Sequence, residues 1–187
     1  MPYKVLLVGE SCKDTYMYGV VDRSYNESKK DSEKSKKVPV FDVEKVITKP
    51  GMASNVKESL ENLGCEVTFL TNSTLIKKTR IVNSKEQTHL VRIDENDSCD
   101  KISLDLLKNI VWNDYDFVVI SDYDKGAVST SLIKEILSKF SRKIFVDTKK
   151  KDLSVFENTI IKINQFENEK VEKWPKSFEL IVTSGEA

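Results

Sequence analysis

Six short apolar runs recur along this chain, and each is followed by a polar or glycine-bearing cluster. The runs are rich in Val, Ile and Phe and do not alternate strictly with polar residues. They occupy residues 4–8, 66–70, 116–120, 143–146, 159–163 and 179–182. Runs of this length and composition are typical of strands that are buried on both faces of a sheet. We therefore expect six buried strands.

Three segments between these runs have helical periodicity. Residues 53–63, 103–111 and 130–140 place apolar side chains three or four positions apart, as on one face of a helix. Gly64 follows the first segment, at a position where glycine commonly ends a helix. Strands that alternate with helices predict an α/β fold with a doubly wound, mostly parallel sheet, which is a Rossmann-like arrangement.

Two further segments have a β-prone composition but lie outside this alternation. Residues 38–47 and 78–93 are separated from their neighbours by polar turns, and we expect them to form a small antiparallel layer. Residues 22–37 are polar and of low complexity, and they are predicted to be an exposed loop or, as the alternative, a flap over a site. We expect a single domain over residues 1–187.

The charge balance restricts the partners of the chain. Thirty Lys and Arg residues balance thirty Asp and Glu residues, which argues against a nucleic acid as the main partner. No apolar run approaches the length of a membrane span or a signal segment. The three cysteines are scattered and His89 is the only histidine, so we expect a reducing, cytoplasmic compartment and no metal site of cysteine or histidine.

Ligands bind to open parallel sheets at the carboxyl ends of the strands, where helices also begin. Residues 50–55 (PGMASN) open the first predicted helix, so their N–H groups are available to an anion or a hydroxyl; a helix cap by Ser54 is the alternative. Residues 121–126 (SDYDKG) offer carboxylates and Lys125 to hydroxyls, metal-bound water or phosphate. The alternative for this second cluster is a solvated turn.

A third polar cluster combines the ends of the last two predicted strands. Residues 164–167 (NQFE) and 183–185 (TSG) each follow a strand, and Asn and Glu side chains suit a magnesium ion that keeps several waters. The chain contains neither a Walker A sequence nor a G-x-G-x-x-G sequence. A P-loop and a dinucleotide-binding site therefore have no support.

Taken in order, these segments resemble a known family. VLLVGESCKDTYMYG is similar to the opening strand of the ribokinase-like (PfkB) carbohydrate kinases, and residues 38–72 resemble their lid strands and Gly-Gly-x-x-Asn helix. The segments QTHLVRIDEN, VVISDYDKGAV, IFVDTKK and INQFENE are most similar to the heptose-7-phosphate kinase domain of bacterial ADP-heptose synthases. The resemblance covers nearly the whole chain and implies a ribokinase-like fold with a β lid.

The resemblance also implies a substrate, a phosphoryl donor and site residues. The implied substrate is a sugar or sugar phosphate, and the implied donor is ATP with Mg²⁺. The implied contacts to sugar hydroxyls are Asp14, Gly51 and Asn55, with Asp14 and Asn55 expected at the carboxyl edge of the parallel sheet. The implied contacts to the sugar or its phosphate are Lys78, Arg80, Arg92 and Lys125. The implied nucleotide-site residues are Asn164, Glu167, Thr183 and Gly185.

Two departures from the family pattern bear on activity. Met52 stands where the family has the second glycine of its helix motif. Residues 1–187 do not contain the later Gly-Ala-Gly-Asp motif from which the family takes its catalytic base, so no catalytic residue is assigned. A positioned base contributes about 10²–10⁴ in rate, and the chain alone is therefore not expected to turn over ATP.

Three functions stay open at this point. The first is ATP-dependent phosphorylation of a sugar or sugar phosphate, with the missing segment supplied by a complementing chain or replaced locally. The second is a non-catalytic module that binds a sugar phosphate or serves in assembly, and the third is a shortened gene product without activity. We expect a homodimer or a complex with such a chain, because a sheet without its later helices exposes apolar surface and an edge.

Overall fold

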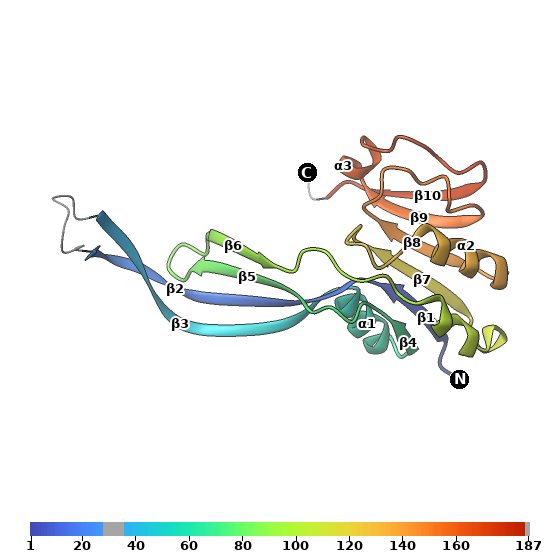
Figure 1. The fold of residues 1–187 in the computed structure, drawn as a ribbon, viewed down its shortest axis with the longest axis horizontal. Coiled ribbons are helices and arrows are strands. Elements are labelled where there is room, and N and C mark those ends of the chain that lie inside the picture. The colour runs from blue at the N-terminus through green and yellow to red at the C-terminus, as the bar shows by residue number, and fades with distance from the viewer. Residues whose placement is uncertain (28–35, 186–187) are drawn as a thin grey trace. The chain divides into compact units, whose positions relative to one another are not determined.

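The computed structural model describes residues 1–27 and 36–185. Within these residues the larger sheet has six parallel strands in the order β10-β9-β8-β7-β1-β4 (Figure 1). The strands are β1 Lys4–Gly9, β4 Glu66–Leu70, β7 Phe117–Asp122, β8 Ile144–Thr148, β9 Thr159–Asn164 and β10 Phe178–Thr183. Each of the six apolar runs forms a strand, and the predicted parallel α/β fold is confirmed.

The order of the strands reverses at β1. From β1 the chain proceeds to β4 on one side and later returns to β7 on the other side, after which β8, β9 and β10 follow outward. Val8 is accordingly paired with Leu70 on one side and with Ile120 on the other. Ligands of open α/β sheets bind at such switch points, beyond the carboxyl ends of the strands. The end of β1 is therefore the place where a ligand site is expected.

One face of this sheet carries the main hydrophobic core. Helix α2 (Thr130–Lys139) packs Leu132, Ile133 and Ile136 against it, and all three side chains are fully buried. Ser129 caps the helix by accepting a hydrogen bond from the Leu132 N–H at 3.2 Å. The side chains that the strands contribute to this core are Leu6, Val8, Val118, Ile120, Ile144, Val146, Ile161 and Ile163.

Helix α1 (Ala53–Asn62) adjoins β1 and β4 (Figure 1). The helix ends where the sequence predicts, because Gly64 takes a left-handed φ of 83° and its N–H donates to the Glu61 carbonyl at 2.9 Å. The alternative in which Ser54 caps the amino end is wrong. Met52 is the N-cap residue, and no side chain caps this helix.

Two predictions about this sheet and its helices are wrong. Residues 103–111 form a 3₁₀-helix, η1 (Leu104–Asn109), rather than an α-helix, and η2 (Trp112–Asp114) follows it. Only Leu107 of η1 is buried, so the segment has too little packed apolar surface to stabilise a longer helix. The two edge strands are not buried on both faces, since β4 has no buried residue and residues 180–182 of β10 are 41% to 48% exposed.

The second sheet has four strands in the order β3-β2-β5-β6. They are β2 Ser11–Glu27, β3 Lys36–Met52, β5 Ile76–Asn83 and β6 His89–Glu95. The pair β5–β6 is antiparallel. The predicted additional β layer is thus present, and β2 is a strand of it that the sequence pattern did not indicate.

The prediction of a loop over residues 22–37 is wrong at both of its ends. Residues 22–27 continue β2 and residues 36–37 begin β3, whereas residues 28–35 lie outside the described part of the chain. Polar side chains do not prevent a strand here, because the hydrogen bonds of a β ladder come from the backbone.

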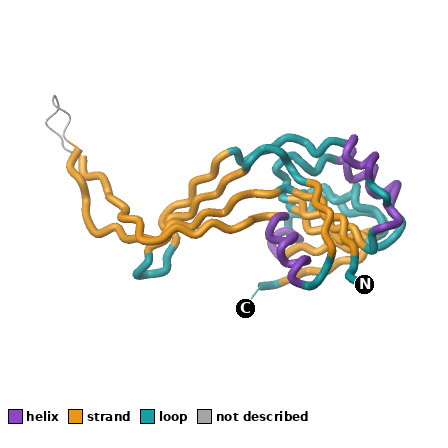
Figure 2. Tube along the Cα trace, turned by 90° about the horizontal axis from the view of Figure 1, so that it is seen from below, coloured by secondary structure: helices purple, strands orange, loops and turns teal. Residues whose placement is uncertain are grey.

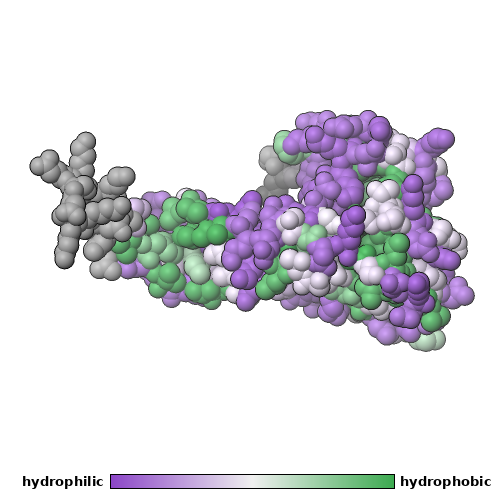
Figure 3. Space-filling view, viewed as in Figure 1, coloured by the Kyte–Doolittle hydropathy of each residue, from purple (hydrophilic) through white to green (hydrophobic). Residues whose placement is uncertain are grey.

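The chain divides into two compact units. Unit 1 comprises Met1–Cys12, Pro50–Ile76 and the residues from Asn96 onward, and it contains the six-stranded sheet. Unit 2 comprises Lys13–Lys49 and Lys77–Glu95 and consists of strands and turns (Figure 2). Hydrophobic residues lie at the surface of unit 2 over β5 and β6 (Figure 3), and residues 90, 91 and 93 of β6 are 41% to 52% exposed.

The described helices are short. Helices α1 and α2 have ten residues each, and α3 (Gln165–Asn168) has four. In the described ranges no helix is long and apolar enough to cross a membrane.

Candidate functional site

Three elements of unit 1 meet closely at the carboxyl end of β1. A Cβ added to Gly9 would lie 2.1 Å from the Ser121 carbonyl oxygen of β7 and 2.9 Å from the Ala53 Cβ of α1. Protein interiors are close-packed, and neither of these neighbours is a flexible side-chain end that can move away. Glycine is therefore required here for steric reasons, and it lets β1, β7 and α1 approach one another.

The side chain of Glu10 is fully buried directly after this glycine. One of its carboxylate oxygens accepts the Tyr123 N–H at 2.7 Å, and the other accepts the N–H groups of Ala127 and Val128 at 3.1 and 3.3 Å. The Glu10 carbonyl oxygen accepts the Ala53 N–H, at the start of α1, at 2.8 Å. One residue thus connects the end of β1 to the loop after β7 and to the first turn of α1.

The loop of residues 123–128 carries Lys125. The Lys125 ammonium group pairs with Asp97 at 2.7 Å. Two loop residues have a left-handed backbone, with φ of 56° at Asp124 and 112° at Gly126. Glycine adopts such a conformation readily, but an aspartate keeps it only where the surrounding structure holds it. The hydrogen bonds that this loop makes therefore determine where Lys125 lies within unit 1.

Asp122 is a second buried carboxylate at the same edge of the sheet. It accepts hydrogen bonds from the Thr148 hydroxyl and the Asp124 N–H, both at 2.9 Å, and it pairs with Lys150 at 3.1 Å. Burial raises the pKa of Asp122, and the positive charge of Lys150 opposes this shift. The pair connects the end of β7 to the loop after β8.

The start of α1 holds two of the residues that are predicted to contact sugar hydroxyls. Gly51 is buried, and Asn55 is exposed in the first turn of the helix. Met52 between them has a left-handed φ of 56°, a conformation that favours glycine. Its side chain packs with Cys12 and Ile76 in a small apolar cluster. The methionine at the family's glycine position is therefore accommodated inside unit 1.

Asn164 and Glu167 form a capping box at the start of α3. The Asn164 side chain accepts the Glu167 N–H at 2.8 Å, and the Glu167 carboxylate accepts the Asn164 N–H at 2.9 Å. Glu167 also pairs with Lys149. Thr183 of β10 is the register partner of Asn164, and the exposed Gly185 follows it. The fold thus brings the two predicted nucleotide segments side by side.

A magnesium ion would fit this corner only as an ion that keeps most of its own waters. The described residues contain no group of three or more His, Cys, Asp or Glu side chains that could enclose a metal. Magnesium sites in phosphoryl-transfer proteins commonly use one or two carboxylates together with phosphate oxygens and waters. Glu167 supplies such a carboxylate, with Asn164 next to it.

In unit 2, Asp14 and Arg80 lie next to each other. The Arg80 Nη2 is 3.9 Å from the Asp14 Oδ1, and the guanidinium carbon is 5.7 Å from the centre of the Tyr16 ring. Asp14 Oδ1 and Arg80 Nε are buried and find no hydrogen-bond partner in the described part of the chain. Buried polar atoms nearly always have a partner, so this acceptor and this donor have the chemistry to bind a polar ligand.

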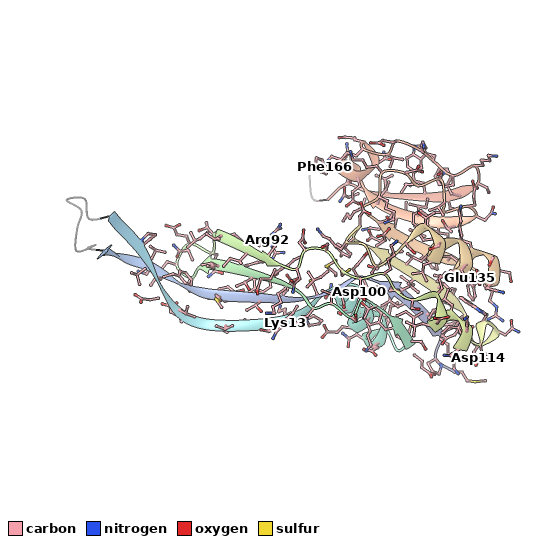
Figure 4. The ribbon with its side chains drawn as sticks, viewed as in Figure 1. Lys13, Arg92, Asp100, Asp114, Glu135 and Phe166 are labelled. Atoms are coloured by element: carbon pink, nitrogen blue, oxygen red, sulfur yellow. The ribbon has the colours of Figure 1, made fainter. Side chains whose placement is uncertain are left out.

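The predicted basic residues of unit 2 share one face. Arg92 lies opposite Arg80 in the β5–β6 ladder, and Lys78 lies opposite Asp94. Residues that are opposite in an antiparallel ladder point to the same side, as do alternate residues of one strand. Lys78, Arg80 and Arg92 are thus brought together, and Arg92, labelled on β6 in Figure 4, pairs with Asp94 at 2.9 Å.

The expected position of Asp14 needs a correction. Asp14 lies on β2 in unit 2 and not at the carboxyl edge of the parallel sheet, because the chain continues as a strand from Ser11. The sequence indicated Asp122 only as one carboxylate of the 121–126 cluster, and it gave Glu10 and Lys150 no role in a site. The available signal was an acidic residue at the end of each of two buried apolar runs that the fold places side by side.

No protein family model matches the chain. Curated relatives do match. The chain is 26% identical to the bifunctional protein HldE of a Nitratiruptor species over an alignment of 200 positions, and the alignment covers 91% of this chain and 42% of that protein. It is 28% identical to the bifunctional protein HldE of Helicobacter acinonychis over 204 residues, covering 89% of this chain and 42% of that protein. The chain thus spans about two fifths of the length of these relatives.

Solved structures agree with the fold. Phosphofructokinase-2 from Escherichia coli in complex with fructose-6-phosphate matches with a TM-score of 0.54 and 14% identity, covering 92% of this chain and 65% of that chain. Arabidopsis thaliana ribokinase complexed with ribose and ATP matches with a TM-score of 0.54 and 12% identity, covering 91% of this chain and 63% of that chain. This chain therefore has a ribokinase-like fold and is related in sequence to part of the bifunctional HldE proteins.

Proposed function

We propose that this chain binds a sugar phosphate and serves in ATP-dependent phosphoryl transfer to a sugar or sugar phosphate. The observation that carries the proposal is the Asp14–Arg80 pair, whose Oδ1 and Nε atoms are buried without hydrogen-bond partners among the described residues. A carboxylate accepts hydrogen bonds from hydroxyls, and a guanidinium group suits phosphate. Arg92, on the same face, adds a second guanidinium group.

The remaining binding roles follow the position of each residue in its own unit. In unit 2, Asp14 accepts a hydrogen bond from a sugar hydroxyl, while Lys78, Arg80 and Arg92 attract the phosphate. In unit 1, the backbone at Gly51 and the exposed side chain of Asn55 contact hydroxyls, and Lys125 contributes a positive charge. We assign no general base to this chain.

The nucleotide part of the proposal concerns the corner formed by β9, α3 and β10. Asn164 and Glu167 would hold a magnesium ion through its waters, and Thr183 and Gly185 would contact the nucleotide. ATP, when bound with Mg²⁺, supplies the phosphoryl group. The support is the adjacency of the two segments in the β9–β10 register, together with the relation to HldE proteins and to a ribokinase solved with ribose and ATP.

Isothermal titration of the 187-residue chain with heptose 7-phosphate and with fructose 6-phosphate tests the binding proposal. We expect binding that weakens roughly tenfold or more in the Arg80→Gln variant, because a charge-assisted hydrogen bond contributes about 1.5–3 kcal/mol. Arg142→Gln is the matched control. This arginine lies in unit 1 two residues before β8, donates to the Tyr115 carbonyl and has no proposed role in binding.

The outcomes separate the possible functions. A wild-type chain that binds neither sugar phosphate at millimolar concentration, or an Arg80→Gln variant that binds as well as wild type, would contradict the proposal. Sugar-phosphate binding without consumption of ATP in a coupled assay would assign this chain a binding role, and turnover would assign it a kinase role.

A further inference from the structure

Glu10 is a buried carboxylate to which the binding proposal gives no role. It is fully buried, and no Lys or Arg forms an ion pair with it within residues 1–27 and 36–185. An ionised carboxylate in such a place is costly unless hydrogen-bond donors surround it. The donors here are the backbone N–H groups of Tyr123, Ala127 and Val128, and they use both carboxylate oxygens.

These three N–H groups lie at the two ends of the loop that carries Lys125. Tyr123 precedes the two left-handed residues of the loop, and Ala127 and Val128 follow them. The carboxylate therefore holds the loop from both sides of its strained part. A Cβ at Gly126 would lie 2.8 Å from the Cys99 carbonyl oxygen, so the loop is also closely packed from outside.

The main chain of Glu10 serves a different element. Its carbonyl oxygen accepts the Ala53 N–H and so holds the start of α1, where Gly51 and Asn55 are located. A substitution of the Glu10 side chain leaves this carbonyl in place. The Glu10 side chain thus holds the loop that carries Lys125, whereas its main chain holds the start of α1 with Gly51 and Asn55. A substitution of the side chain affects only the loop.

We propose that Glu10 is a positioning residue that fixes the 123–128 loop so that Lys125 recognises the phosphate of a sugar phosphate. This inference rests on the proposed function. Glu10 does not touch the ligand; it acts through Lys125, whose ammonium group is held near Asp97 until an anion binds. The unphosphorylated part of the sugar is recognised without the Glu10 side chain.

A double-mutant cycle on the full chain tests the inference. Glu10→Gln keeps the length of the side chain but leaves one oxygen where two are needed, so an amide NH₂ faces backbone N–H groups. We expect Glu10→Gln to raise the Kd for heptose 7-phosphate roughly tenfold, the effect of about one lost charge-assisted hydrogen bond. The same substitution in a Lys125→Met background is expected to leave the Kd unchanged, because residues that act as one unit are not additive.

Two further variants separate positioning from general stability. Glu157→Gln is the matched control, because Glu157 also accepts backbone N–H groups, those of Lys176 and Ser177, at the opposite edge of the same sheet. It is expected to lower the melting temperature without changing the Kd. Glu10→Asp keeps both oxygens and is expected to restore part of the affinity. If Glu10→Gln does not fold, Glu10→Asp with and without Lys125→Met carries the test.

The titration results distinguish a failure of the proposed function from a failure of the inference about Glu10. A wild-type chain that binds neither heptose 7-phosphate nor fructose 6-phosphate removes the proposed function and this inference together. If wild type binds, then unchanged affinity in the folded Glu10 variants, or losses that simply add to that of Lys125→Met, would overturn the inference alone. Faster amide hydrogen exchange at residues 123, 127 and 128 in Glu10→Gln, together with the non-additive loss, would support it.

Discussion

At the scale of single residues, Gly9 is a position of unit 1 where close packing leaves no room for a side chain. Gly9→Ala would place a Cβ 2.1 Å from the Ser121 carbonyl oxygen, and neither backbone can yield without moving a central strand. We expect a loss of at least about 3 kcal/mol, at the upper end of the cost of overpacking. Gly64→Ala is the control, because its Cβ would meet nothing and only its φ of 83° is unfavourable, costing about 1 kcal/mol. Urea unfolding measures both, and equal losses would contradict the steric argument.

Asp100 determines a pH dependence at the same scale. The hydroxyls and N–H groups of Thr74 and Ser73 donate hydrogen bonds to it and hold its pKa below the ordinary value. Ionised Asp100 therefore stabilises the fold above the unfolded-state pKa of about 3.9, and this contribution is lost as the pH falls through the lower folded-state pKa.

We expect Asp100→Asn to be less stable than wild type at pH 7. The difference between the two melting temperatures should become smaller as the pH approaches 2, and thermal unfolding across this pH range measures it. Asp114, labelled with Asp100 in Figure 4, is an exposed aspartate of η2, and Asp114→Asn is the matched control. A constant difference for Asp100→Asn would contradict the assignment.

At the scale of elements, Glu167 of α3 has two proposed roles, one in capping the helix and one in binding Mg-ATP, and a single substitution distinguishes them. Glutamine is accepted at the third position of a capping box, so Glu167→Gln should preserve α3 and change the stability by less than about 1 kcal/mol. If Glu167 serves magnesium, the same substitution should weaken the binding of Mg-ATP roughly tenfold, because it removes the charged acceptor. Titration of the variant with Mg-ATP measures this, with the exposed Glu169→Gln as control. An unchanged affinity for Mg-ATP would show that Glu167 serves only to cap α3.

Strand β10 is the element from which we expect self-association. It is an edge strand of the described sheet, residues 180–182 are exposed, and residues 178–183 contain none of the lysines or prolines that commonly protect such edges. We expect the chain to sediment as a dimer or larger species at micromolar concentration and Ile181→Lys to shift it toward the monomer. Val111→Lys, at an exposed apolar position outside the strands, is the control. Dissociation by Val91→Lys of β6 instead would place the contact on unit 2.

At the scale of the whole molecule, the two units differ in how much apolar surface they bury. The main core lies in unit 1, whereas Val20 and Val82 are the buried apolar side chains among the described residues of unit 2. Local stability follows buried apolar contact, so unit 2 should open at lower urea. Both tryptophans, Trp112 and Trp174, are in unit 1, so their fluorescence should change at higher urea than the far-UV circular dichroism. Coincident transitions would show one cooperative molecule.

The sequence by itself determined the local elements of unit 1. Apolar runs located all six parallel strands, and helical spacing located α1 and α2, because side-chain period and composition report burial over a few residues. It also located the polar ends of these strands, and therefore the carboxyl edge at which Lys125, Asn164 and Glu167 lie. The same local signal failed for residues 103–111 and for β2, where little apolar surface is buried.

The tertiary structure alone decided which of these segments meet. The Glu10 carboxylate bonds N–H groups 113 to 118 positions away, and Asp14 meets Arg80 only because β2 pairs with β5. Nothing in the period or composition of a segment names its partner, since backbone hydrogen bonds are alike for every strand. The polar residues 22–27 became part of a strand for the same reason. Pairing between distant segments, rather than local pattern, sets the site.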